Sequence, residues 1–170
     1  MTTSSLNPTH GSEPQPAART LPVSRAILYA TLVVGVLDAT DGVVFLGLHG
    51  QNPIQVLQYI ASSLLGARSF SGGLASAALG VALHFAIALV VATIYILASR
   101  RVAVLRTHWA LLGLLYGAAV WAVMNLVMVP LTAVAHSPIT TAALVNGVIS
   151  HALFVGLPSA FFAKKVEAGA

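Results

Sequence analysis

The most regular feature of the chain is the alternation of long apolar runs with short polar breaks. Crossing a bilayer requires about 20 mostly apolar residues in a helix. Four stretches meet this requirement, at about 26–48, 73–98, 109–134 and 140–163. The pattern therefore predicts an all-α polytopic membrane protein, a bundle of four transmembrane helices within residues 25–165.

The connection between the first two runs has a pattern of its own. Asn52 is suited to cap a helix, Pro53 to begin it and Gly66 to end it, which predicts a short helix at about 53–66. One side of this helix is apolar (Ile54, Leu57, Ile60, Ala61, Leu64, Leu65) and the other is largely polar (Gln55, Gln58, Ser62, Ser63). We interpret it as an interfacial helix at the outer membrane surface. A helix packed over the mouth of the bundle is the alternative.

Residues 1–24 lack an apolar period and contain four prolines with many Ser and Thr residues. This composition is typical of a disordered tail. The run that follows is long enough to span a membrane and contains acids, so we do not interpret the N-terminus as a cleaved signal peptide.

Composition supports a membrane protein. Hydrophobic residues make up 58% of the chain and charged residues only 7%, whereas soluble domains carry roughly 25% charged residues. The lipid bilayer is therefore the expected partner. The absence of cysteine excludes disulfides and thiolate chemistry. The eight basic residues are scattered among apolar runs and form no face for nucleic acid.

The positions of the basic residues predict the orientation. Seven of the eight precede the first run, separate the second and third runs, or follow the fourth, and only Arg68 lies in the first connection. The seven are Arg19, Arg25, Arg100, Arg101, Arg106, Lys164 and Lys165. Because cytoplasmic loops are enriched in Lys and Arg, both termini and the 99–108 loop are predicted to be cytoplasmic.

An internal repeat is visible in the polar residues. Tyr29, Asp38 and His49 have the same spacings, 9 and 11, as Tyr116, Asn125 and His136. The sequence GVALH at 80–84 also matches GVISH at 147–151. We interpret the chain as two tandem helical hairpins related by a pseudo-two-fold axis along the membrane normal, although such matches could arise by chance.

Five polar residues lie within the apolar spans, and four of them are expected at a similar depth in the membrane. The helical rise of 1.5 Å places Asp38, His84, Asn125 and His151 roughly 15–20 Å below the outer surface, near the midplane of the hydrocarbon core. The fifth, Asp41, is expected nearer the outer surface. Small residues repeat every four positions on the same faces, which favours close helix packing, and include Gly35, Gly80, Gly113, Gly117 and Gly147.

Several functions fit this polar cluster. Ionisable residues inside a membrane often mark a proton or ion pathway, so the protein could handle protons, a cation or a small solute. Because four helices enclose little space, a pathway could form between the protomers of a homo-oligomer. Alternatively, the cluster only fixes helix packing, as in a structural or accessory protein.

Two further hypotheses involve a bound group. His84 and His151 with Asp38 could hold a divalent metal ion, and paired histidines, including His49 with His136, could ligate haem. No ligand spacing supports either one, so no cofactor is expected. Because no nucleophile–base or phosphate-binding motif is present, an enzyme is not expected.

The segment LQYIASSLLGARSFSGGLASAALGVALHFAIAL (57–89) resembles small, uncharacterised four-helix proteins of the bacterial inner membrane. The resemblance extends over residues 25–165. It implies the four-helix topology and an inner-membrane location, and it implies no activity.

Overall fold

The structure is a computed structural model that describes residues 20–134 and 138–167. Four helices in it are long and apolar enough to cross a membrane, and they run from Val23 to Leu48, Gly73 to Arg101, Trp109 to Leu131 and Thr141 to Ala163. The described residues form no strand, and their only β-type pairing is an isolated bridge between Leu21 and Val166. The prediction of an all-helical chain with four membrane-length helices is confirmed.

The first two spans are continuous α-helices, α1 (Val23–Leu48) and α3 (Gly73–Arg101). The other two are segmented. The third consists of α5 (Trp109–Val123), η2 (Met124–Met128) and η3 (Val129–Leu131), and the fourth of α6 (Thr141–Ser150), η4 (His151–Gly156) and α7 (Leu157–Ala163). The short helices α2 (Pro53–Leu65), η1 (Gly66–Ser71) and α4 (Val104–Thr107) lie in the connections.

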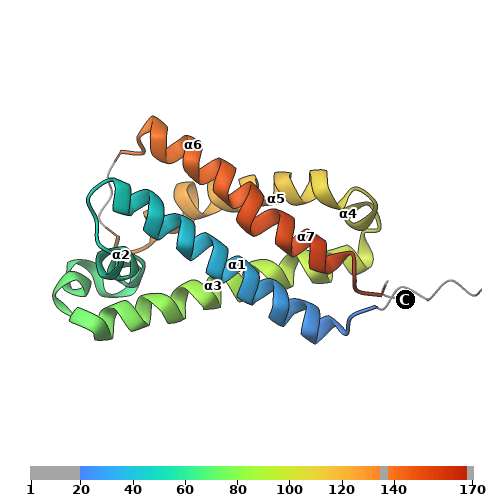
Figure 1. The fold of residues 1–170 in the computed structure, drawn as a ribbon, viewed down its shortest axis with the longest axis horizontal. Coiled ribbons are helices and arrows are strands. Elements are labelled where there is room, and N and C mark those ends of the chain that lie inside the picture. The colour runs from blue at the N-terminus through green and yellow to red at the C-terminus, as the bar shows by residue number, and fades with distance from the viewer. Residues whose placement is uncertain (1–19, 135–137, 168–170) are drawn as a thin grey trace, which may run out of the picture.

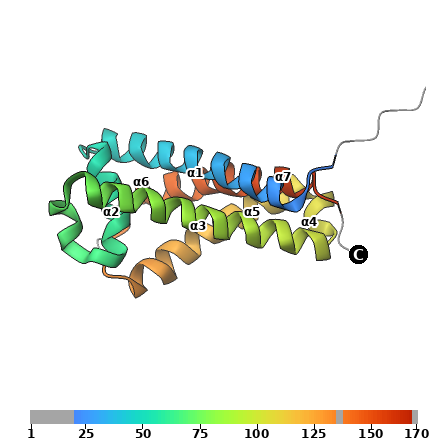
Figure 2. The same cartoon turned by 90° about the horizontal axis from the view of Figure 1, so that it is seen from below.

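The spans pack side by side along the long axis of the molecule (Figures 1 and 2). α1 packs against α3 and against the fourth span, and α5 packs against η4 and α7. α4 lies at the same end as the beginning of α1 and the end of α7, whereas α2 lies at the opposite end (Figure 1). The backbone N–H of Leu21 donates to the Lys165 carbonyl (2.8 Å), which joins the two ends of the described chain.

The buried core is built mainly from small residues. Ala26, Ala30, Ala92, Ala160 and Ala163 are fully buried around Tyr95 and Ile96. Many leucine, valine and isoleucine side chains are exposed on the outside of the bundle. This distribution suits a lipid environment, because small residues let helices approach closely and lipid solvates large apolar side chains.

Prolines account for the segmentation of the second pair of spans. Both η2 and η4 are π-helical, and Pro130 and Pro158 follow them. Because proline has no N–H, the helix cannot continue its normal bonding there, and the N–H of Leu157 bonds to Ala152, five residues back. α1 and α3 contain no proline and are regular throughout.

Helix α2 begins where the sequence predicts, with a capping box between Asn52 and Gln55 and with Pro53 in its first turn. Gln58 and Ser62, assigned to the polar side, are buried, whereas Ile54, Leu64 and Leu65 of the apolar side are exposed. Gln58 donates to the Gly73 carbonyl (3.0 Å) and to Ser76 Oγ (3.3 Å) of α3. The interfacial position of this helix stays a prediction.

Basic residues gather at the end of the molecule opposite α2. Lys164 lies over the Trp109 ring, 3.8 Å from its centroid, and Lys165 lies over Phe161 at 4.3 Å. Arg100 and Arg101 end α3 at the same end of the bundle. Of the proposed tail at 1–24, residues 1–19 lie outside the described residues, as does His136 of the proposed repeat.

Candidate functional site

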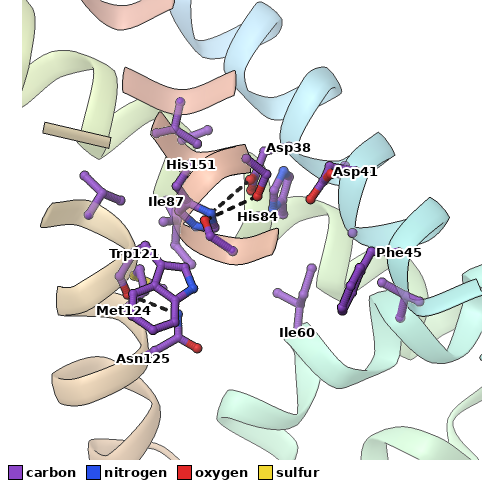
Figure 3. A pocket seen from close by; sticks show the side chains of 18 of the residues that line it. Asp38, Asp41, Phe45, Ile60, His84, Ile87, Trp121, Met124, Asn125 and His151 are labelled. Atoms are coloured by element: carbon purple, nitrogen blue, oxygen red, sulfur yellow. Dashed lines mark hydrogen bonds and ion pairs between the residues drawn. The ribbon is translucent and has the colours of Figure 1, made fainter. Parts of the chain in front are cut away.

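Asp38 and His151 connect the first and fourth spans. Asp38 Oδ1 lies 3.6 Å from His151 Nδ1, and each side chain is 21% exposed. The separation is longer than a hydrogen bond, and His151 Nδ1 has no hydrogen-bond partner among the described residues. The contact is thus an ion pair when the imidazole is protonated, and both groups keep bonding capacity for a third species (Figure 3).

Asp41 is held by a residue that the sequence did not single out. Its Oδ2 accepts a hydrogen bond from Asn146 Nδ2 in α6, at 3.0 Å. Asn146 directly precedes Gly147, one of the small residues selected from the sequence, in the fourth span. The sequence does contain a signal that could have identified Asn146, because a carboxamide within an apolar span needs a hydrogen-bond partner inside the bundle.

His84 is turned toward the backbone of α1. Its Nε2 lies 2.9 Å from the carbonyl oxygen of Gly35. A carbonyl can only accept, so the Nε2–H of His84 donates, and Nδ1 carries the lone pair whenever the ring is neutral. Gly35 also faces the Phe85 ring, so closely that a Cβ would overlap it. Both contacts join α1 to α3.

Asn125 lies in the π-helical segment η2. Its Nδ2 donates to the Trp121 carbonyl of its own span, at 3.0 Å. Trp121 in turn directs its indole toward α6, where a Cβ at Gly147 would overlap Nε1. Asn125 is therefore engaged locally, and its side-chain oxygen is the group left for a ligand.

His151 is positioned by a close approach between α5 and η4. A Cβ at Gly117 would overlap the backbone of His151 and Ala152, and one at Gly113 would overlap Ala160 and Gly156. Gly80 plays a similar part between α3 and α2, where a Cβ would overlap the backbone of Leu57. The five glycines selected from the sequence therefore all lie at contacts between elements.

All five polar residues selected from the sequence line one cavity of about 310 Å³ (Figure 3). Asn146 lines the same cavity. Residues of α2, including Tyr59 and Ile60, also line it. Partial burial raises the pKa of the Tyr59 phenol above its ordinary value of 10.0, so this group stays protonated. A cavity of this size lies at the lower end of the range for small-molecule sites.

The cavity is lined by acidic side chains and not by strongly basic ones, as far as the described residues show. Among the residues that the structure describes, its lining includes two carboxylates, Asp38 and Asp41, and no lysine or arginine. Two imidazoles, two carboxamides, the Tyr59 phenol, the Trp121 indole and the Ser150 hydroxyl supply the remaining polar groups. A proton, a small cation or a hydrogen-bond donor would complement this lining.

A metal ion lacks a suitable set of ligands here. Among residues 20–134 and 138–167, no group of three or more His, Cys, Asp or Glu side chains is placed to hold one. His84 is directed to a backbone carbonyl, although His151 and Asp38 are close together. The hypothesis of a metal site at His84, His151 and Asp38 therefore receives no geometric support.

Comparison of the chain with protein-family models, with curated proteins and with solved structures found no match. The geometry of the cavity is therefore the basis for assigning a role.

Proposed function

We propose that this chain is a multi-pass protein of the bacterial inner membrane that handles protons or a small cationic solute in its central cavity. The observation that carries this proposal is the convergence of Asp38, Asp41, His84, Asn125 and His151, from four different spans, on one cavity. Ionisable groups in a membrane are costly, and they are commonly retained where they bind or relay an ion.

Asp38 and His151 are the proposed exchange pair. A proton on His151 Nδ1 can pass to Asp38 Oδ1 across their 3.6 Å contact, which converts imidazolium and carboxylate into imidazole and carboxylic acid. The same carboxylate can accept a small cation in place of the proton. Asp41, held by Asn146, would serve as a second acceptor about one helical turn along α1.

The orientation follows from charge. With both termini and α4 in the cytoplasm, the basic residues near Arg100 and Lys164 face the side that the positive-inside rule favours. α2 then lies on the outer side as an interfacial helix. Its exposed Ile54, Leu64 and Leu65 suit an apolar surface, while its buried Gln58 holds it to α3.

The tandem-hairpin relationship remains part of this proposal. His84 and His151, which correspond in the repeat, line the same cavity, as do Asp38 and Asn125. The two hairpins differ in that only the second contains π-helical segments. A homo-oligomer, in which a pathway runs between protomers, and the absence of enzymatic activity also remain expectations.

A packing role is the second candidate, because a specific observation favours it. His84 and Asn125 use their side-chain donors on the carbonyls of Gly35 and Trp121, as residues that only fix helix register would do. In that case Asp38 would stabilise the bundle without exchanging a ligand.

Reconstituted protein distinguishes the two roles. Vesicles containing a pH-sensitive dye would report proton flux under an imposed gradient, with and without a small ammonium ion outside. Asp38→Asn is expected to abolish flux while the protein remains folded. Thr40→Val is the matched control, because Thr40 is exposed and bonds only to its own helix at Val36. Equal flux from all three proteins, or folding lost with Asp38→Asn, would favour the packing role.

A further inference from the structure

A second, apolar groove lies beside the polar cavity. It has a volume of about 500 Å³ and runs between α3 and the third span. Its walls are apolar side chains and Tyr116, whose hydroxyl is already used on the Val91 carbonyl (2.7 Å). The lining residues are Leu83, Ala86, Ile87, Val90, Val91, Ile94, Tyr116, Ala119, Val120, Val123, Met124 and Met128.

The path of the third span explains this groove. Tyr116 bridges α3 and α5, and beyond it the span continues into η2 and η3 and diverges from α3 (Figure 2). The groove follows α3 from Leu83 to Ile94, which is roughly 16 Å by helical rise. That distance is about half the hydrocarbon core, so the groove can hold an alkyl chain lying along the helices.

The groove and the polar cavity are in contact. Four residues line both: Ile87, Val91, Val120 and Met124. One layer of side chains therefore separates an apolar surface from the cavity that contains Asp38 and His151. Methionine is unbranched and flexible, so Met124 can move aside at little energetic cost.

We propose that the two spaces form one binding site for a single-chain amphiphile with an ammonium head, which enters from the lipid between α3 and α5. This inference rests on the proposed function of the cavity and names its ligand class. The ammonium head lies against the carboxylates of Asp38 and Asp41, in a lining to which the described part of the chain contributes no lysine or arginine, and the alkyl tail occupies the groove. Trp121, Phe45 and Tyr59 supply aromatic faces that favour a cation.

The chain provides its own reporter for this test. It has two tryptophans, Trp109 and Trp121, and only Trp121 lines the cavity. In a Trp109→Phe background, a brominated dodecylamine should quench Trp121 fluorescence saturably in lipid nanodiscs. Unlabelled dodecylamine should reverse the quenching, and dodecanoate of the same length should not, because its carboxylate is repelled by Asp38 and Asp41.

Substitutions in the groove test the binding of the alkyl tail independently of the binding of the ammonium head. Ala86 is exposed and lines the groove, and Ala82, one turn away on α3, is exposed but does not line it. We expect Ala86→Phe to weaken dodecylamine binding by about tenfold or more, with competition by propylamine unchanged and with Ala82→Phe like the parent. Ala119→Phe fills the opposite wall and should act like Ala86→Phe, which provides a second variant if one of them folds poorly.

The outcomes distinguish this inference from the proposed function. If Asp38→Asn weakens propylamine and dodecylamine alike while Ala86→Phe and Ala119→Phe change neither, the cation site stands and the lateral tail site is overturned. If dodecanoate competes as well as dodecylamine, the assignment of an ammonium head is wrong. If Asp38→Asn alters neither amine, the proposed function itself fails.

Discussion

Asp38 Oδ1 and His151 Nδ1 lie 3.6 Å apart, although 113 residues of sequence, 151 minus 38, separate them. This contact joins a regular α-helix, α1, to the π-helical segment η4 of the last span. π-helical turns occur frequently at functional sites. The pair therefore contributes both to the packing of the first span against the fourth and to the polar lining of the cavity.

Energetic coupling between these two residues is the first prediction. In a double-mutant cycle with Asp38→Asn and His151→Gln, we expect a coupling free energy of about 0.5–3 kcal/mol in the unfolding of detergent-solubilised protein. The control cycle combines Thr40→Val with His151→Gln, where the effects should add to within about 0.5 kcal/mol. Additivity in both cycles would mean that the 3.6 Å contact has no energetic consequence.

The second prediction concerns the contact between α5 and η4. A Cβ at Gly117 would overlap the backbone of His151, so Gly117→Ala should lower the free energy of unfolding by about 1–3 kcal/mol. Gly47 is the matched control, because it lies in α1 with no neighbouring atom within 4 Å of a Cβ. Thermal unfolding of Gly47→Ala should stay near that of the parent. Equal effects at both sites would contradict the close approach.

The third prediction tests the docking of α2. Gln58→Met removes the hydrogen bonds that Gln58 Nε2 donates to the Gly73 carbonyl and to Ser76 Oγ, which should cost about 0.5–1.5 kcal/mol for each bond, while Ser76 Oγ still donates to the Gly73 carbonyl (3.1 Å). Amide hydrogen exchange over residues 53–65 should accelerate in this variant. Gln51→Met, at an exposed position just before the helix, should leave the exchange unchanged. Slow exchange in both variants would show that α2 is held by other contacts.

The fourth prediction concerns orientation. Reporter fusions at residues 104 and 170 should give a cytoplasmic signal, and a fusion at residue 68, in η1, should give a signal from the outer side. The physical reason is the concentration of basic residues at the end that contains α4 and Lys164. A cytoplasmic signal from residue 68 would invert the proposed topology.

The spans could be predicted from the sequence because lipid imposes a simple length and polarity requirement on each one. The predicted start of the first span, at 26, differs from the observed Val23 by three residues. Four small residues on one face of α3, Ser76, Gly80, Ala88 and Ala92, repeat at multiples of four positions and are buried, and His84 is half-buried among them. Their burial could be predicted because it follows from the spacing of residues along a single helix.

The details of the site could not be predicted, because they depend on contacts between distant segments. The partnership of Asp41 with Asn146 spans 105 residues and has no spacing signature. The π-helical turn at His151 depends on both Pro158 and the close approach to Gly117. For α2 the usual rule is reversed, because the surroundings of the bundle are apolar: Gln58 is buried within the protein and Leu64 is exposed.

The central claim is that a cation reaches a polar cavity inside the membrane, and thiol labelling tests it most directly. The chain has no cysteine, so single-cysteine variants are unambiguous. Ser150 lines the cavity, whereas its neighbour Ile149 is exposed on the outside of the bundle and does not line it. Ser150→Cys in vesicles should react with a cationic, water-soluble methanethiosulfonate about tenfold or more faster than with an anionic one. Asp38→Asn should remove that preference, and Ile149→Cys should remain unreactive. Equal rates for the two reagents at Ser150→Cys, or no reaction there at all, would contradict a cation-selective cavity.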